Sequence, residues 1–315
     1  MTDGATLLAE IVDAGKPKRV LGEVHRMLAG ILEKDDMRRL DQVFSEVQRL
    51  FAGRYPGYSK CNTRYHDLEH TTDTFLAMAR LIHGAVEAGR AIGRHTILLG
   101  LVSTLLHDTG YIQTEDDRVG TGAKYTAGHI FRSINFAREY LPSRGYSRTD
   151  YTVCRNALLC TGIDNRIGKI PFRTQDEALI GKMLGTSDLL GQMASCRYLE
   201  KLPYLYQELV EGEILKHVSE YDFLENTTAF HHSTLDRFDG DLGGVSAYMR
   251  DHFRARWSID RDLYRQAIDE NITYLGSVLR RHPADYLPLL KIRKKKGPKP
   301  ALPLGNTRTW ARSRG

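Results

Sequence analysis

Two closely spaced histidines are the first candidates for chemistry in this sequence. His66 and His70 lie four residues apart in residues 65–75, which read YHDLEHTTDTF. If this segment is helical, both imidazoles project from one face, one turn apart. Histidine is the commonest metal ligand in proteins and transfers protons near neutral pH. A solvated, polar helix start is the alternative interpretation, because acidic residues surround the pair.

A second candidate is the dipeptide His107-Asp108. It directly follows residues 97–106 (ILLGLVSTLL), the longest apolar stretch of the chain. Two titratable groups at the end of a buried helix cost several kcal/mol unless they are paired or bind a metal. A structural hydrogen bond between the two residues is one explanation. Together with the histidine pair, the dipeptide favours metal binding.

Two further residues extend this set. Asp188 stands in the apolar segment 179–193, directly before two leucines. A buried carboxylate there needs a cation or hydrogen-bond donors, although a helix cap or a salt bridge would explain Asp188 equally well on its own. His129 belongs to residues 127–141, which have a helical pattern. Metal ligation and a position on the helix surface are both compatible with His129.

Helices must position these residues, because apolar side chains recur at spacings of three and four along most of the chain. Such stripes occupy residues 20–32, 37–51, 179–193, 205–215 and 263–279. No region shows sustained alternation of polar and apolar residues with hairpin turns, as strands would require. The sequence therefore predicts an all-α fold.

The charge of the chain is concentrated at its C-terminus. The composition is globular, with 41% hydrophobic and 27% charged residues and a formal net charge of +6. Nine of the 45 Lys and Arg residues lie in residues 291–315, which contain no Asp or Glu, so the rest of the chain has a net charge of −3. We interpret residues 291–315 as a basic disordered tail. Any binding of nucleic acid is therefore expected through this tail alone.

The sequence also predicts a cytoplasmic protein without a membrane anchor. The four cysteines have no C-x-x-C spacing, and the N-terminus has no uninterrupted apolar core of the kind that a secretory signal contains. Residues 97–106 are about half as long as a membrane-spanning helix must be.

In their order along the chain, the candidates resemble the HD superfamily of metal-dependent phosphohydrolases. Members take their metal ligands in the order His, His-Asp, Asp from separate helices of an all-α domain, and here His70 is followed after 37 residues by His107-Asp108 and later by Asp188. The segment YHDLEHTTDTF is also similar to the tyrosine-histidine-asparagine-x-x-histidine stretch of the cyclic-nucleotide phosphodiesterases. The resemblance covers residues 65–193.

Two residues depart from the phosphodiesterase pattern. Asp67 replaces the asparagine, and Tyr111 stands near a place where those enzymes often have another histidine.

The resemblance implies a role for each candidate. It makes His70, His107, Asp108 and Asp188 the ligands of the principal ion. It makes His66 the proton donor to the leaving oxygen, and Asp108 a bridge to a second ion or to the attacking hydroxide, so that His66 and Asp108 count as catalytic. Imidazole and carboxylate ligands suit Zn, Mn, Fe, Co or Ni at the main site. A second ion, Mg or Mn, with His129 as a ligand, stays open.

The expected organisation is an HD-domain helical bundle with flanking helices. Residues 1–60 are interpreted as N-terminal helices that pack on the core, and residues 61–195 as the HD core. Residues 196–290 are interpreted as C-terminal helices of the same domain, before the tail of residues 291–315. The adjacent His231 and His232 lie outside the matched region and are interpreted as a surface or loop pair.

The expected activity is hydrolysis of a phosphoester. The resemblance favours a nucleotide phosphodiester as the small-molecule substrate, and two alternatives stay open: a nucleotide phosphomonoesterase, and a non-catalytic HD-domain protein that senses a nucleotide or a metal. A homodimer is compatible with the sequence. No membrane partner is expected.

Overall fold

Helices make up all of the extended regular structure in residues 4–291, the part of the chain that this computed structural model describes. Pairing of extended backbone in this part is limited to two isolated β-bridges. The all-α prediction is therefore confirmed. The α-helices are α1 (Gly4–Ile11), α2 (Pro17–Leu28), α3 (Lys34–Phe51), α4 (Leu68–Glu87), α5 (Arg94–Leu106), α6 (His129–Ser143), α7 (Arg148–Leu159), α8 (Gln175–Met193), α9 (Tyr198–Glu211), α10 (Glu220–Asp239), α11 (Tyr248–Trp257), α12 (Leu263–Arg281) and α13 (Leu287–Leu290), and the short 3₁₀ helices are η1 (Thr109–Tyr111), η2 (Gly122–Tyr125), η3 (Ile167–Lys169) and η4 (Val245–Ala247).

Each apolar stripe of the sequence falls on a helix, but some helix ends differ from the predicted ones. The stripe of residues 20–32 lies on α2, which ends at Leu28. The stripe of residues 205–215 lies on α9, which ends at Glu211 because Gly212 takes the C-cap position. Apolar side chains in the loops that follow continue the spacing without continuing the helix.

The centre of the fold consists of α4, α5 and α8. Helix α5 is apolar on all sides, and its residues from Ile97 to Leu106 are buried, as expected for a helix surrounded by others. Helix α4 packs against both α5 and α8. Gly191 lets α8 approach α4 closely, since a Cβ atom at this position would lie 2.8 Å from the backbone nitrogen of Thr74. The close contact brings the residues of α8 near those of α4.

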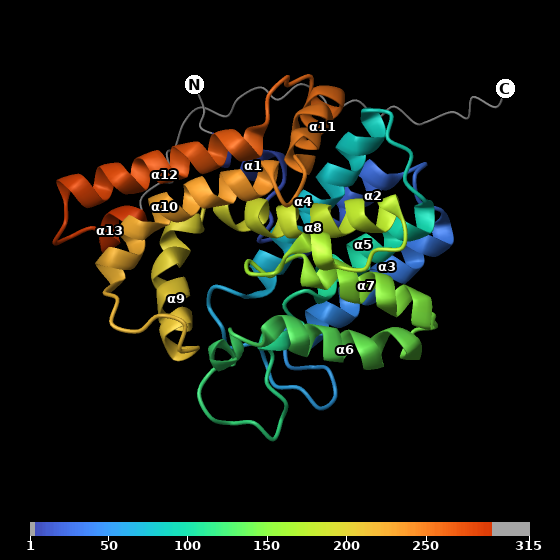
Figure 1. Cartoon of the computed structure of the whole chain (residues 1–315), viewed down its shortest axis with the longest axis horizontal. Coiled ribbons are helices and arrows are strands. Elements are labelled where there is room, and N and C mark those ends of the chain that lie inside the picture. Colours follow the sequence, from blue (N-terminus) through green and yellow to red (C-terminus); the bar gives the residue numbers. More distant parts are fainter. Residues whose placement is uncertain (1–3, 292–315) are drawn as a thin grey trace.

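The C-terminal helices share the hydrophobic core of the central helices. One cluster of buried side chains extends from Ala5 in α1 to Leu290 in α13. In Figure 1, α12 and α10 lie together at the upper left, α9 descends from them, and α6 runs along the lower side. Helix α1, from the other end of the chain, packs on α12.

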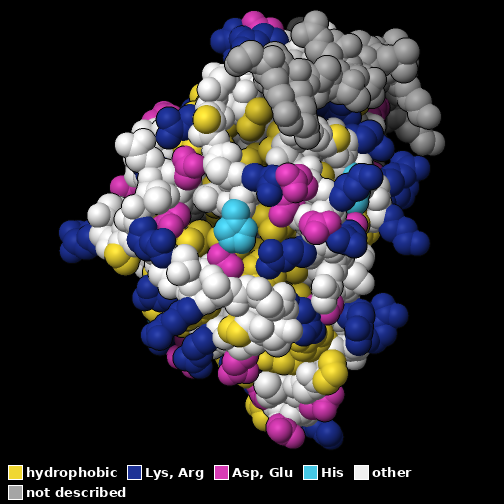
Figure 2. Space-filling view, turned by 90° about the vertical axis from the view of Figure 1, so that its right-hand side faces the viewer, with side chains coloured by type: hydrophobic (Ala, Val, Ile, Leu, Met, Phe, Trp, Pro, Cys, Tyr) yellow, Lys and Arg dark blue, Asp and Glu magenta, His cyan; other side chains and the backbone are white. Residues whose placement is uncertain are grey.

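The surface of the described part has mixed charge on the face shown in Figure 2, where basic and acidic side chains are interspersed. No helix in residues 4–291 combines the length and the apolar character that crossing a membrane requires. The predicted basic tail lies outside the described residues, apart from Lys291.

A buried histidine makes the packing of α11 on α4 sensitive to acid. His252 is 0% exposed, neither of its ring nitrogens has a hydrogen-bond partner, and its ring lies 5.0 Å from that of His83. Burial, together with the neighbouring His83, Arg80 and Arg256, holds the pKa of His252 well below 6.5. An unfolded chain takes up a proton at this residue near pH 6.5, whereas the folded protein does not. His252 therefore contributes a loss in the free energy of unfolding as the pH decreases from 6.5.

We expect His252→Leu to reduce this acid sensitivity. If the unfolded chain binds one proton more than the folded protein, the free energy of unfolding changes by at most about 1.4 kcal/mol per pH unit. Urea denaturation at pH 6.5 and pH 5 should thus show a smaller loss of stability in the variant than in the unaltered protein. The exposed His282 provides the control, His282→Gln, which should retain the full loss. An equal loss in all three proteins would contradict the assignment to His252.

Candidate metal centre

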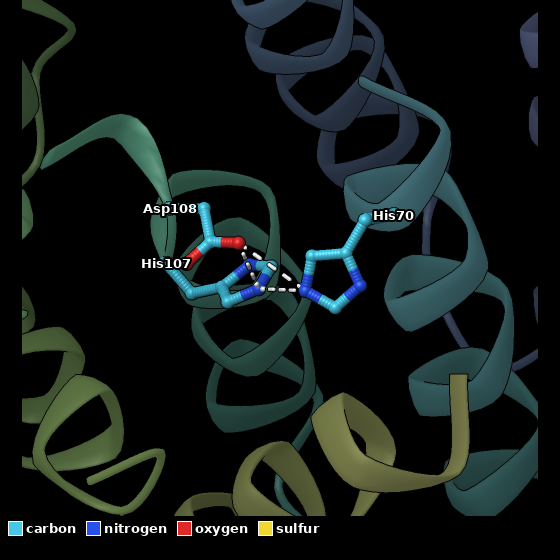
Figure 3. Close-up of side chains that lie close together, drawn as sticks. All are labelled: His70, His107 and Asp108. Carbon is cyan, nitrogen blue, oxygen red and sulfur yellow. Dashed lines mark hydrogen bonds and ion pairs between the residues drawn. The ribbon is translucent and has the colours of Figure 1, made fainter. Parts of the chain in front are cut away.

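Two imidazoles and two carboxylates from three helical segments converge at one buried point. The ligand atoms of His70, His107 and Asp108 all lie within 4.8 Å of one another, and Figure 3 shows them pointing together. The Nε2 atoms of the two histidines are 3.3 Å apart. Asp188 Oδ1 lies 3.1 Å from His70 Nε2 and 3.6 Å from His107 Nε2. The structure thus brings together all four residues that the sequence predicted as principal ligands.

The start of α4 positions His70, but it leaves His66 outside the helix. Asp67 is the N-cap residue, and its side chain accepts a hydrogen bond from the backbone N–H of His70 at 3.0 Å. The prediction of one helical face for both histidines was therefore wrong, because an N-cap residue has non-helical backbone angles and His66 precedes it. The two rings are still close, with centroids 5.7 Å apart. Asp67 thus caps the helix that carries His70.

The end of α5 positions His107 and Asp108. Helix α5 ends at Leu106, and the chain turns through η1. Gly110 in this turn permits contact with the start of α6, since a Cβ atom there would lie 2.0 Å from the carbonyl oxygen of His129. The Ser133 hydroxyl of α6 donates to the carbonyl of His107 at 2.5 Å and accepts from the N–H of Gly110 at 2.9 Å. These bonds hold the dipeptide at the apolar end of the helix.

The chemistry of the cluster fits a divalent cation. His107 Nδ1 donates a hydrogen bond to the carbonyl oxygen of Thr104 at 2.7 Å. In the neutral ring, Nε2 therefore carries a lone pair, and it points at carboxylate oxygens that can only accept. Asp108 Oδ2 is buried and has no hydrogen-bond partner, although both Nε2 atoms lie within 3.3 Å of it. Converging lone pairs in a buried site require a positive charge at their centre. A metal ion can therefore bind to His70, His107 and Asp108.

Without a metal, protons on the histidines supply this positive charge. Burial opposes protonation of His70, but the facing Asp108 and Asp188 outweigh it and raise the pKa of His70 to about 9. They raise the pKa of His107 well above its usual range in the same way. The imidazoles in turn outweigh the effect of burial on both carboxylates and lower the pKa of Asp108 and of Asp188. A metal ion must therefore compete with protons for these ligands.

His129 lies beside the cluster at the first position of α6. Its Nδ1 atom donates to the carbonyl of Thr126 at 2.7 Å, and its Nε2 atom is 3.9 Å from Asp108 Oδ1. Burial lowers the pKa of His129, while Asp108 acts in the opposite direction. A neutral imidazole whose lone pair faces the second oxygen of Asp108 fits a ligand of a second ion.

His66 is oriented by a residue that the sequence did not reveal. Its Nδ1 atom donates to Glu208 Oε2 on α9 at 2.7 Å. The other oxygen of Glu208 accepts from the backbone N–H groups of Arg64 and Tyr65, each at 2.6 Å. Burial raises the pKa of Glu208, but His66 and the two amides outweigh it and lower the pKa overall. The sequence signal for Glu208 is weak: an acidic residue next to the apolar stripe of α9.

Tyr111 lies between the rings of His66 and His129. Its ring stacks on His66 on one side, with centroids 4.2 Å apart, and on His129 on the other, at 4.6 Å. Burial raises the pKa of Tyr111 well above 10, so its hydroxyl stays neutral. Tyr111 therefore fixes the spacing of the two histidine rings.

A cavity of about 470 Å³ opens onto this site. Its floor includes Asp108, Asp188, His66 and His129. Helices α9 and α10 supply most of an apolar wall, which includes Leu202, Leu205, Leu209, Phe223 and Phe230. None of the described residues that line the cavity is a Lys or an Arg. The C-terminal helices, whose function the sequence left open, thus complete the cavity.

Other candidates lie elsewhere or have structural roles. His231 and His232 belong to α10, not to a loop, and His231 is buried with its Nε2 atom 3.3 Å from Asp269 on α12. Neither residue lines the cavity. Among the aromatic residues after position 195, Tyr198, Phe223 and Phe230 line it, whereas the ring of Tyr204 packs against the Arg64 guanidinium at 3.6 Å.

Comparison of the chain with known proteins finds no matching family model, no matching curated protein and no matching solved structure. The fold and the site define an all-α protein with a buried group, His70, His107 and Asp108, that can hold a metal ion.

Proposed function

We propose that this protein is a divalent-metal-dependent phosphohydrolase that cleaves a phosphoester, with a nucleotide phosphodiester as the favoured substrate. The observation that carries the proposal is the convergence of His70, His107, Asp108 and Asp188 beside a cavity. Asp108, Asp188 and His66 line that cavity. The resemblance to the HD superfamily supports the same assignment. The ion is expected to be Zn, Mn, Fe, Co or Ni, with a second Mg or Mn ion beside His129.

Each residue of the site would have a different role in hydrolysis. A divalent ion lowers the pKa of bound water towards neutrality and offsets charge on phosphoryl oxygens. His70, His107, Asp108 and Asp188 would hold that ion, and Asp108 faces both His107 and His129. His66 donates from Nδ1 to Glu208, so its Nε2 atom is free to exchange a proton with the leaving oxygen.

The charge of the cavity supports a substrate with few negative charges. Asp108, Asp164 and Asp188 line it, and no described Lys or Arg does. A bound ion would thus be the main positive charge that faces the substrate. A phosphodiester carries one negative charge, whereas monoesters and polyphosphates carry more. The aromatic rings of Phe223 and Phe230 offer surfaces on which a planar base can pack.

A substrate panel tests this proposal. Protein loaded with Mn²⁺ or Co²⁺ is expected to hydrolyse bis(p-nitrophenyl) phosphate with a kcat/KM at least about tenfold above that for p-nitrophenyl phosphate. A factor of ten is about 1.4 kcal/mol, the size of one additional unit-charge repulsion in a partly solvated site. Elemental analysis of the purified protein measures the bound metal in parallel.

The outcomes separate the alternatives. Preference for the monoester would favour a phosphomonoesterase. Tight metal binding without hydrolysis of any ester would favour a non-catalytic sensor and contradict the proposed activity.

A further inference from the structure

His70 differs from the other histidines of the site in one respect. The Nδ1 atoms of His107 and His129 each donate to a backbone carbonyl, and that of His66 donates to Glu208. The Nδ1 atom of His70 is buried and has no hydrogen-bond partner among the described residues. Its Nε2 atom faces Asp108 and Asp188. In the neutral ring that a metal requires, Nε2 carries the lone pair and Nδ1 must carry the hydrogen.

This arrangement leaves an N–H group of a metal ligand without an acceptor. A buried donor without a partner costs about 1–3 kcal/mol. Ligating histidines almost always donate their second N–H to a carboxylate, a carbonyl or a water molecule. The structure should therefore hold an acceptor for His70 close by.

A small cavity lies beside His70. Its volume is about 10 Å³, which is close to the smallest space that holds one water molecule. It is lined by Tyr65, His70, Asp73, Gln192, Ser195, Tyr198 and Lys201. A buried water molecule needs two to four polar partners, and this lining offers them.

Asp73 is the acceptor that this cavity provides. It follows His70 by three residues on α4, so both side chains lie on the same side of the helix. No described residue forms a hydrogen bond with its carboxylate, whereas the nearby Asp67 and Glu69 are paired with Lys201 and Arg197. The carboxylate of Asp73 is thus available on the wall of the small cavity.

We infer that Asp73 is a positioning residue, which holds one water molecule that accepts the Nδ1–H bond of His70 and so fixes the ligand for the metal. The water donates to the Asp73 carboxylate, and Lys201 on the same wall supplies a second contact. Asp73 does not touch the ion or the substrate cavity. Its role is to keep the hydrogen of the neutral His70 ring on Nδ1, so that the lone pair of Nε2 is aimed at the ion. This inference rests on the proposed metal site.

Metal affinity tests the inference without any assay of activity. We expect Asp73→Asn to raise the dissociation constant for Co²⁺ about tenfold, since loss of a partner of a ligand weakens metal binding by about 10–100-fold. Asp73→Glu, which keeps the carboxylate, should restore most of the affinity. Glu69→Gln is the matched control, because it removes the same charge one turn earlier but does not line the small cavity. We expect it to change the affinity less than about twofold, because the Glu69 carboxylate bonds to Arg197 and not to His70.

The ring N–H signals of the Co²⁺-loaded protein give a second measurement. The signal of His70 is expected to exchange faster with solvent in Asp73→Asn, whereas that of His107, held by the Thr104 carbonyl, should stay unchanged.

The inference is overturned if Asp73→Asn binds Co²⁺ as tightly as the unaltered protein does. It is also overturned if Glu69→Gln loses as much affinity for Co²⁺ as Asp73→Asn. If the unaltered protein binds no divalent metal at all, both the proposed function and this inference fail. Circular dichroism of each variant checks that the overall helix content is unchanged.

Discussion

Asp188→Ala and His70→Ala are each expected to remove the bound metal and the activity together. Metal binding by four protein ligands is worth about 10–16 kcal/mol, or roughly 3 kcal/mol per ligand. The loss of one ligand therefore corresponds to a dissociation constant roughly 100-fold larger. The oxygen of Asp188 lies against both imidazoles of the cluster, so its removal leaves one side of the site open. Elemental analysis and titration with Zn²⁺ or Mn²⁺ measure the effect.

Asp164→Asn is the matched control for this prediction. Asp164 also lines the cavity, but it is exposed and has no contact with the metal-binding group. If the negative charge of the cavity alone attracted cations, Asp164→Asn would weaken metal binding as much as Asp188→Ala. We expect the metal content of Asp164→Asn to stay unchanged. Full metal content in Asp188→Ala and His70→Ala would rule out the proposed ligand set.

The fold was predictable because the helical periodicity of the sequence is strong and local. The residues at helix ends were less predictable, since capping depends on hydrogen bonds that periodicity does not reveal. His66 illustrates this limit: Asp67 caps α4, and the helix begins after the first histidine. His231 and His232 show the opposite error. They were interpreted as a surface or loop pair, but they lie in the middle of α10.

The site was predictable only in part. A cap or a salt bridge explained Asp188 equally well on its own, and its proposed role as a ligand came from the resemblance, in which an Asp follows the His and His-Asp ligands. Glu208 was missed because its contact with His66 joins residues 142 positions apart. Asp73 was seen only as one of the acidic residues around the histidine pair, since no local pattern shows that the nearby Nδ1 atom of His70 is unpartnered. Such contacts depend on tertiary packing.

His66→Gln is expected to lower kcat by about 10²–10⁴-fold, the usual effect of losing a general acid, while the bound metal stays in place. His66 is not among the residues that make up the metal-binding group, so its replacement leaves those ligand atoms unchanged. A comparison of substrates with different leaving groups tests whether His66 supplies a proton to the leaving oxygen. A nitrophenolate leaves readily without a proton, whereas an alkoxide needs one. The loss should therefore be much larger for an alkyl phosphodiester than for bis(p-nitrophenyl) phosphate.

Glu208→Gln separates the orientation of His66 from its proton transfer. The amide keeps an oxygen that can accept from the backbone N–H groups of Arg64 and Tyr65, but it removes the charge that faces His66 Nδ1. We expect a smaller loss of kcat than in His66→Gln, with the same dependence on the leaving group. A loss that is equal for both leaving groups in His66→Gln would instead assign His66 to substrate binding. Loss of metal from either variant would place His66 among the ligands.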